Sequence, residues 1–453
     1  MQAGGAAPTS APMSAPGSLP EQARYGADSV LMKSEKVLHE FFPQSGGDFS
    51  PGGSRVIRFD ISSSDFMDLS EARLACTYTT GATTDSTILD GGLGGTIQSL
   101  TIKNSAGQQL EIIDEYALIQ SLLIQCSDRA RMEQAQLYVE EMFIADSNNI
   151  PDADDTTYAI NAATARNLTH KFHGAWFQST KKKLLPPGVA FKVEIQLVAN
   201  ANDTMSNRGN NANDFTLSNV SIQIPTVRIM NQAFEDQTAR MLARGYRWTG
   251  ATYRAYNHSL DQIGARNLVI ADKSLALTGM LGVARLTASI GDNQLLQNYV
   301  REGAAFENDY NLTIGSKQYP PVKIDYVGSN AQTVSESNAT FELATNLSQV
   351  SAVLGNVPYS GNVVFGTDAA DNVAPLFPGD NIGRPAANRG TGFLAVQVGY
   401  QQGVGMDTQT ASLPVIFNFQ TRLANLTFTA IAQATATFSM QPEQGMLMVR
   451  SFI

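Results

Sequence analysis

Alternation of apolar and polar side chains with a period of two residues is the feature of this sequence that most constrains its fold. The clearest run spans residues 191–197 and follows the turn Pro186-Pro187-Gly188. Further runs occur on both sides of the middle of the chain, at residues 57–61, 74–78, 220–224, 322–326, 415–419 and 426–428. A strand shows this pattern when one face is buried and the other is wet, as in antiparallel sandwiches. The sequence therefore predicts an all-β fold built from sandwiches.

The length and composition indicate more than one core. The chain has 453 residues, of which 43% are hydrophobic and only 16% are charged. Apolar material of this amount exceeds what one small core holds, so two domains are expected. The 37 glycines and the scarcity of charged side chains favour short strands joined by turns over long helices.

A few short helices interrupt the strands. One is predicted near residues 114–126, with apolar residues at spacings of three and four and Asp114 as its N-cap, and a second is predicted at residues 132–143. Residues 343–355 form an equivalent inserted helix in the second half and end at a glycine. The Gly, Pro and Asn content of residues 356–392 predicts a long loop.

The same signals divide the chain into three parts. Residues 1–50 begin as a low-complexity Ala, Gly, Pro and Ser segment and are expected to be a flexible N-terminal arm, with Val37, Leu38, Phe41 and Phe42 available for burial against a neighbour. A helical crossover at residues 231–245 then separates a first domain, residues 51–235, from a second, residues 236–453. Residues 1 to about 30 are expected to be dispensable for folding but needed for assembly.

The charge balance argues against direct binding of nucleic acid. The formal net charge is −10, and Arg24 and Lys33 are the only basic residues among the first 33. A chain that neutralises phosphates carries the opposite balance. The run Lys181-Lys182-Lys183 is interpreted as a solvated loop, because three adjacent lysines before a Pro-Pro turn rarely form a binding site.

Cysteine usage and the N-terminal sequence bear on the compartment. Cys76 and Cys126 are the only cysteines, and neither a secretory segment nor a run of 18 apolar residues accompanies them. Reduced thiols are therefore expected in a chain that folds in a cytosol or nucleus, is not exported through a signal peptide and does not cross a membrane.

No group of residues points to catalysis. His170 and His173 have a spacing that suits a metal but lack further ligands, and Asp152, Asp154 and Asp155 lack the glycine and final glutamate of a calcium loop. The glycines at residues 91–95 precede no Lys-Ser/Thr and predict a flexible turn. We therefore assign no catalytic, cofactor-binding or metal residue and expect no cofactor and no enzyme activity, although a weak calcium site between subunits stays open.

Three stretches together resemble double jelly-roll major capsid proteins of icosahedral DNA viruses, the lineage of polinton-like viruses, virophages and adenoviruses. They are FFPQSGGDFSPGGSRVIRFDISSSDFMDLSEARLACTYT at residues 41–79, KKKLLPPGVAFKVEIQL at residues 181–197 and NVSIQIPTVRIM at residues 219–230. The resemblance concerns the layout of residues 40–450. It implies two consecutive jelly-roll sandwiches with short inserted helices.

The same resemblance implies a role and partners. Three chains would form a pseudo-hexagonal capsomer that tiles a viral shell, and the chain would be made and assembled in the host cytoplasm or nucleus and would reside in the virion. Its partners would be further copies of itself, neighbouring capsomers, and penton and minor capsid proteins, without sequence-specific binding of nucleic acid.

Two other functions stay open. The first is a secreted or surface-displayed adhesin or carbohydrate-binding sandwich, which clustered exposed aromatic residues would favour. The only tryptophans, Trp176 and Trp248, lie far apart in the sequence. The second is a sandwich hydrolase, which needs paired carboxylates in a cleft.

Overall fold

The computed structural model describes most of the strands that the sequence predicts. The described residues are 34–81, 86–88, 92–125, 163–178, 184–207, 213–229, 245–291, 306–326, 393–399, 405–410, 413–443 and 446–452. The predicted helices at 132–143 and 343–355, the loop at 356–392 and all but the last residue of the crossover at 231–245 lie outside them.

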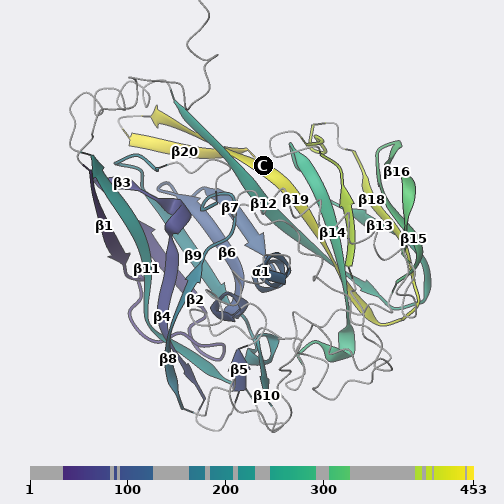
Figure 1. Ribbon diagram of the computed structural model, residues 1–453, viewed down its shortest axis with the longest axis horizontal. Coiled ribbons are helices and arrows are strands. Elements are labelled where there is room, and N and C mark those ends of the chain that lie inside the picture. Colours follow the sequence, from purple (N-terminus) through teal and green to yellow (C-terminus); the bar gives the residue numbers. More distant parts are fainter. Residues whose placement is uncertain are drawn as a thin grey trace, which may run out of the picture.

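Two antiparallel sheets form the first sandwich (Figure 1). One sheet has the order β1 (Ser34–Phe41), β11 (Phe215–Ile229), β4 (Arg73–Thr80) and β8 (Ala165–Lys171), and the short β3 (Phe66–Met67) also pairs with β11. The facing sheet has the order β2 (Val56–Ile61), β9 (Phe191–Leu197), β6 (Ile97–Asn104) and β7 (Gln109–Asp114). A separate ribbon pairs β5 (Ser86–Ile88) with β10 (Met205–Asn207).

The second sandwich is built in the same way. Its first sheet has the order β12 (Tyr246–Leu260), β19 (Leu426–Glu443), β14 (Leu277–Leu286) and β17 (Phe393–Gln397), and β20 (Met446–Phe452) extends it beside β19. Its second sheet has the order β13 (Gly264–Ile270), β18 (Val415–Thr421), β15 (Phe306–Ile314) and β16 (Lys317–Tyr326). All strand pairings among the described residues join strands on the same side of residues 230–244.

The two sandwiches share one topology. If the eight principal strands of each are lettered B to I in chain order, the sheet orders are B-I-D-G and C-H-E-F in both halves. This double Greek key is the jelly roll. The predicted fold class, all-β with two consecutive jelly rolls and few helices, is confirmed.

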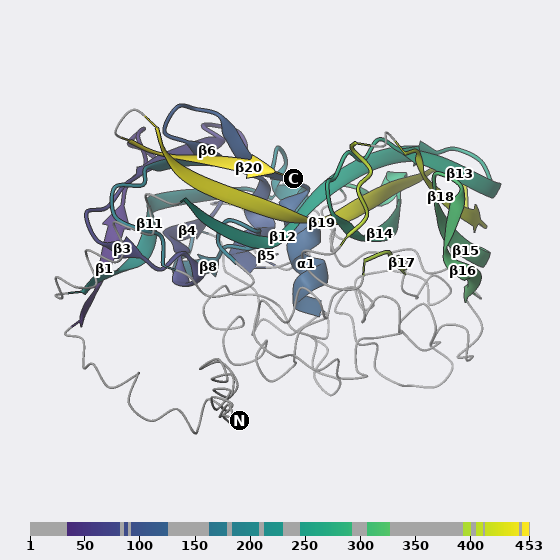
Figure 2. The same cartoon turned by 90° about the horizontal axis from the view of Figure 1, so that it is seen from above.

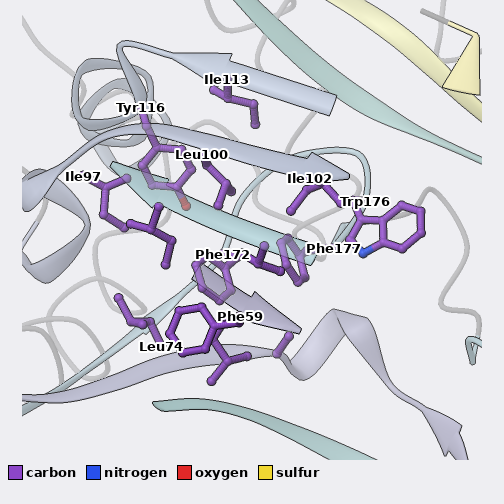
Figure 3. Packing of buried hydrophobic residues seen from close by; sticks show 14 of the residues in the cluster. Phe59, Leu74, Ile97, Leu100, Ile102, Ile113, Tyr116, Phe172, Trp176 and Phe177 are labelled. Atoms are coloured by element: carbon purple, nitrogen blue, oxygen red, sulfur yellow. The ribbon is translucent and has the colours of Figure 1, made fainter. Parts of the chain in front are cut away.

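The apolar residues of the alternating runs are buried in the structure. Ile57 and Phe59 of β2, Leu74 of β4, and Val193 and Ile195 of β9 are all fully enclosed. Side chains from both sheets meet between the layers (Figure 3). A second cluster fills the far sandwich around Phe417, Phe419 and Phe428, and the rings of the last two stack 4.7 Å apart. Burial of one face of these alternating strands is thus what sets their register.

Local structure between β5 and β8 differs from two predictions. The helix α1 (Tyr116–Gln125) forms as expected. Asp114, however, is the last residue of β7 rather than the N-cap of α1, and Glu115 follows with a φ of 53°. Residues Gly92–Thr96 form a buried 3₁₀ helix rather than a flexible turn, because this segment packs beneath α1 and β8. Among the described residues, no helix has the length and apolar content that crossing a membrane requires.

The end of the expected arm is part of the first sheet. Strand β1 pairs antiparallel with β11, from Ser34 opposite Ile229 to Phe41 opposite Ile222. The sandwich therefore includes residues before position 51. Sequence did not predict this strand because both of its faces are exposed, which removes the alternation of burial.

This register predicts how truncations behave. Removing residues 1–30 leaves β1 intact, so the free energy of unfolding in urea should not change. Removing residues 1–42 strips β11 of a hydrogen-bonded neighbour and Phe41 from the edge of the core, and should cost about 1–3 kcal/mol. If removal of residues 1–30 alone made the chain insoluble, this account would be contradicted.

Candidate functional site: the seam between the two sandwiches

A group of buried aromatic and polar side chains lies where the two sandwiches meet. One hydrophobic cluster runs without a break from the first sandwich into β12, β14, β19 and β20 of the second. Strand β12 lies along β7, and β20 contacts β6 and β7 (Figure 1). We call this contact the seam.

Three aromatic rings form its centre. Trp176, in the segment after β8, lies 5.4 Å from the ring of Trp248 on β12 and 5.3 Å from that of Phe438 on β19. Trp248 and Phe438 also lie 5.3 Å apart. Each such pair adds about 0.5–1.5 kcal/mol beyond the area that it buries. The two tryptophans that are distant in sequence are therefore brought together, in the interior rather than on an exposed platform.

A buried carboxylate holds the segment that carries Trp176. Glu111 of β7 is 1% exposed, and its Oε1 and Oε2 accept hydrogen bonds from the backbone N–H groups of Ala175 at 2.8 Å and Trp176 at 2.9 Å. Burial raises the pKa of Glu111, while the Thr252 side chain and these two amides act in the opposite direction. Enclosed in this way, the carboxylate positions the backbone and has no access to a substrate.

Glycine allows the second sandwich to approach that segment. A Cβ atom on Gly250 of β12 would lie 2.6 Å from the carbonyl oxygen of Ala175 and 2.7 Å from its Cα. Both are backbone atoms, which cannot move aside as a flexible side chain can. Gly174, with a φ of 125°, supplies the turn that points both amides toward Glu111.

Polar side chains connect the two halves around this centre. Asn104 Nδ2 donates to the carbonyl oxygen of Val449 at 3.1 Å, and Asn257 Nδ2 donates to Glu115 Oε1 at 2.9 Å. Asn202 Nδ2 donates to the carbonyl oxygen of Gly291 at 3.0 Å. The described parts of the two sandwiches are thus joined as one block, because the bonds surround a continuous apolar contact.

The histidine pair lies in the core beside the seam. His170 is fully buried, with Nε2 2.9 Å from the Tyr116 hydroxyl and Nδ1 3.2 Å from Gln120 Nε2, so both of its ring nitrogens are engaged. The Tyr116 hydroxyl also accepts from the backbone N–H of His173 at 2.9 Å. A Cβ on Gly94 would lie 2.6 Å from the His170 ring, so the glycine run makes room for this cluster. These contacts favour the structural interpretation of the pair.

The other residues singled out in the sequence are placed as follows. Among the described residues, no group of three or more His, Cys, Asp or Glu side chains is arranged to hold a metal ion. Cys76 is a buried free thiol, and burial raises its pKa to about 12. Asp152, Asp154, Asp155, Lys181, Lys182, Lys183 and Cys126 lie outside the described residues.

Glu111, Gly250 and Asn104 were not anticipated. In QLEIID the glutamate stands between two apolar residues of a strand, where a charged side chain normally meets solvent. Its burial follows from a segment more than 60 residues away in the chain, and no local pattern signals that contact.

Comparison with known proteins identifies the fold. No family model matches the chain, and no curated protein matches it. Among solved structures, a chain of the Sputnik virophage particle matches with a TM-score of 0.56 at 12% identity, over 98% of this chain and 95% of that one.

Two structures of the PBCV-1 virus also match. The crystal structure of PBCV-1 VP54, fitted into a reconstruction of Sputnik, has a TM-score of 0.55 at 6% identity, and the PBCV-1 capsid has 0.54 at 8%. Both cover 92% of this chain and 97% of that one. The chain therefore has the double jelly-roll fold of viral major capsid proteins, as its sequence resemblance implied.

The close approach at Gly250 gives a test of the seam. Gly250→Ala should lower the free energy of unfolding by about 1–3 kcal/mol, because its methyl group overlaps backbone atoms. Gly52→Ala is the matched control, since nothing lies within 4 Å of the added carbon. Urea denaturation of both variants measures the difference, and equal stabilities would show that the seam is looser than described.

The histidine pair predicts a dependence on pH. Burial, with the charges of His170 and Lys171, lowers the pKa of His173 from 6.5 to about 3. Between these values the unfolded chain binds a proton that the folded chain does not. The free energy of unfolding is therefore unaffected by this group above pH 6.5 and falls as the pH drops from 6.5 toward 3, by at most about 5 kcal/mol.

His173→Phe removes this titration and keeps an aromatic ring at the position. As the pH falls from 7 to 4, the free energy of unfolding of the wild type should decrease relative to that of the variant. Groups that do not interact with His173 cancel in this difference. A difference that is constant over the range would show that His173 titrates normally.

Proposed function

We propose that this chain is the major capsid protein of an icosahedral DNA virus. The observation that carries the proposal is the joining of two jelly rolls of identical topology into one block by a dry, hydrogen-bonded seam. A shell subunit needs this rigidity because it must present fixed faces to its neighbours. The likeness to the Sputnik and PBCV-1 structures over nearly the whole chain supports the same role.

The proposed working unit is a homotrimer that forms a pseudo-hexagonal capsomer. Three two-roll blocks place six similar sandwiches around one axis, and closed cyclic symmetry then requires a heterologous contact between copies. Residues 1–50 would engage neighbours, with the division between rolls near residues 232–246. Other capsomers, penton proteins and minor capsid proteins are the further partners, and the virion is the location after assembly in the host cytoplasm or nucleus.

The proposed role is structural rather than catalytic. The enclosed Glu111 and the engaged His170 hold the fold together, and neither is open to a substrate. The net charge of −10 supports a shell whose subunits do not grip the genome directly.

The alternative is an adhesin or carbohydrate-binding protein, since jelly rolls also occur in lectins. Sugar-binding sites present aromatic faces to solvent, whereas Trp176 and Trp248 are buried against each other. We therefore favour the capsid role.

Light scattering coupled to size-exclusion chromatography tests this proposal, with electron microscopy of the same fractions. The full chain should form trimers or larger closed particles at micromolar concentration, because permanent interfaces typically exceed about 2,000 Å². A chain that stays monomeric at high concentration, or that binds a glycan in a defined stoichiometry as a monomer, would overturn the assignment.

A further inference from the structure

The seam joins unlike faces of the two jelly rolls. From the first sandwich it uses the C-H-E-F sheet, through its edge strand β7 and the neighbouring β6. From the second it uses the B-I-D-G sheet, through its edge strand β12 and the added β20. Because the halves share one topology, each half also has the face that the other half contributes to the seam.

The two sandwich faces that do not take part in the seam are exposed, whereas the two that form it are buried. Strand β12 is buried along Gly250–Tyr253, whereas its counterpart β1 is exposed from Ser34 to Glu40. Strand β7 buries Leu110, Glu111 and Ile113, whereas its counterpart β16 exposes Lys317, Gln318, Pro321 and Lys323. The two exposed strands lie at opposite ends of the molecule (Figures 1 and 2).

We infer that the β1 face of one copy packs against the β16 face of the next copy, so that the contact between chains repeats the seam within the chain. This inference rests on the proposed capsid function and names the surfaces that its trimer would use. A head-to-tail contact of this kind is heterologous and closes into a ring when its rotation permits.

The side chains of the two faces are complementary. Val37 and Leu38 on β1 are 42% and 44% exposed, one on each side of the strand, and exposed apolar residues on an edge strand favour a partner. Glu35 lies on the same side of β1 as Val37 and Glu40 on the same side as Leu38, while Lys36 is paired with Glu71 at 2.6 Å. Strand β16 exposes Lys317 and Lys323 on either side of Pro321. Opposite charges around an apolar centre fix the register of a contact and disfavour β1 against β1.

Charge reversal tests the pairing. Glu35→Lys with Glu40→Lys changes the net charge from −10 to −6, and Lys317→Glu with Lys323→Glu changes it to −14. Each double variant should raise the midpoint concentration of assembly at least about tenfold, equivalent to 1.4 kcal/mol. The quadruple variant returns to −10 and should recover most of the loss, because the opposite charges face each other again. Absence of recovery would overturn the pairing.

A matched pair of variants tests whether assembly depends on β1 itself or on any exposed apolar residue. Leu38→Lys and Val269→Lys each add one positive charge at an exposed apolar residue of an edge strand, on β1 and β13 respectively. The counterpart of β13 in the first half is β2, which has no extensive contact with the second half among the described residues. Leu38→Lys should impair assembly about tenfold or more and Val269→Lys should not. The reverse order would overturn the inference.

Cysteine trapping distinguishes the possible partners of β1. In a Cys126→Ser background, Leu38→Cys combined with Lys323→Cys should give disulfide-linked multimers under mild oxidation, whereas either change alone should not. Multimers from Leu38→Cys alone would indicate a symmetric β1–β1 contact and would overturn the inference. Circular dichroism melts of every variant establish that it is folded.

Two failures have different meanings. If the wild-type chain is monomeric at all concentrations, the proposed capsid function itself fails. If the wild type forms trimers but the β1 and β16 variants assemble normally, the function stands and the assigned surfaces are wrong.

Discussion

The arrangement of the whole molecule depends on how Glu111 holds the segment around Trp176. Two backbone amides donate to its carboxylate, and this fixes Trp176 against Trp248 and Phe438 of the second sandwich. A buried carboxylate is costly unless it is fully hydrogen-bonded, so its environment tolerates few alternatives. By fixing the backbone that carries Trp176, the carboxylate holds this ring in one position against the second sandwich.

The fold class was predictable because strand burial is a local signal. Alternation over five to seven residues marked β2, β4, β9, β11 and β18 correctly, since each strand has one face in its own core. The helix α1 was found from its apolar spacing for the same reason. Assignments that needed a particular end residue, such as Asp114, failed because helix ends depend on a single turn.

The seam was not predictable because its residues are defined by partners far away in the chain. Gly250 resembles any strand glycine until Ala175 is placed against it, and Glu111 resembles a solvent-facing residue until it meets two amides. Strand β1 was missed for the opposite reason. It is exposed on both faces in the single chain, so its sequence carries no alternation of burial. The two failures thus have different causes, since distant contacts define the seam and exposure removes the alternation from β1.

The charge of the chain limits how copies can meet. Chains that each carry −10 repel one another at long range, but at physiological ionic strength screening confines this repulsion to about 8 Å. Association must then come from short-range burial and local charge pairs rather than from steering. The seam shows that these two sandwich faces bury well against each other, with aromatic rings at the centre and amide hydrogen bonds around them. In the proposed capsomer, copies of the chain need only repeat this geometry to close a ring.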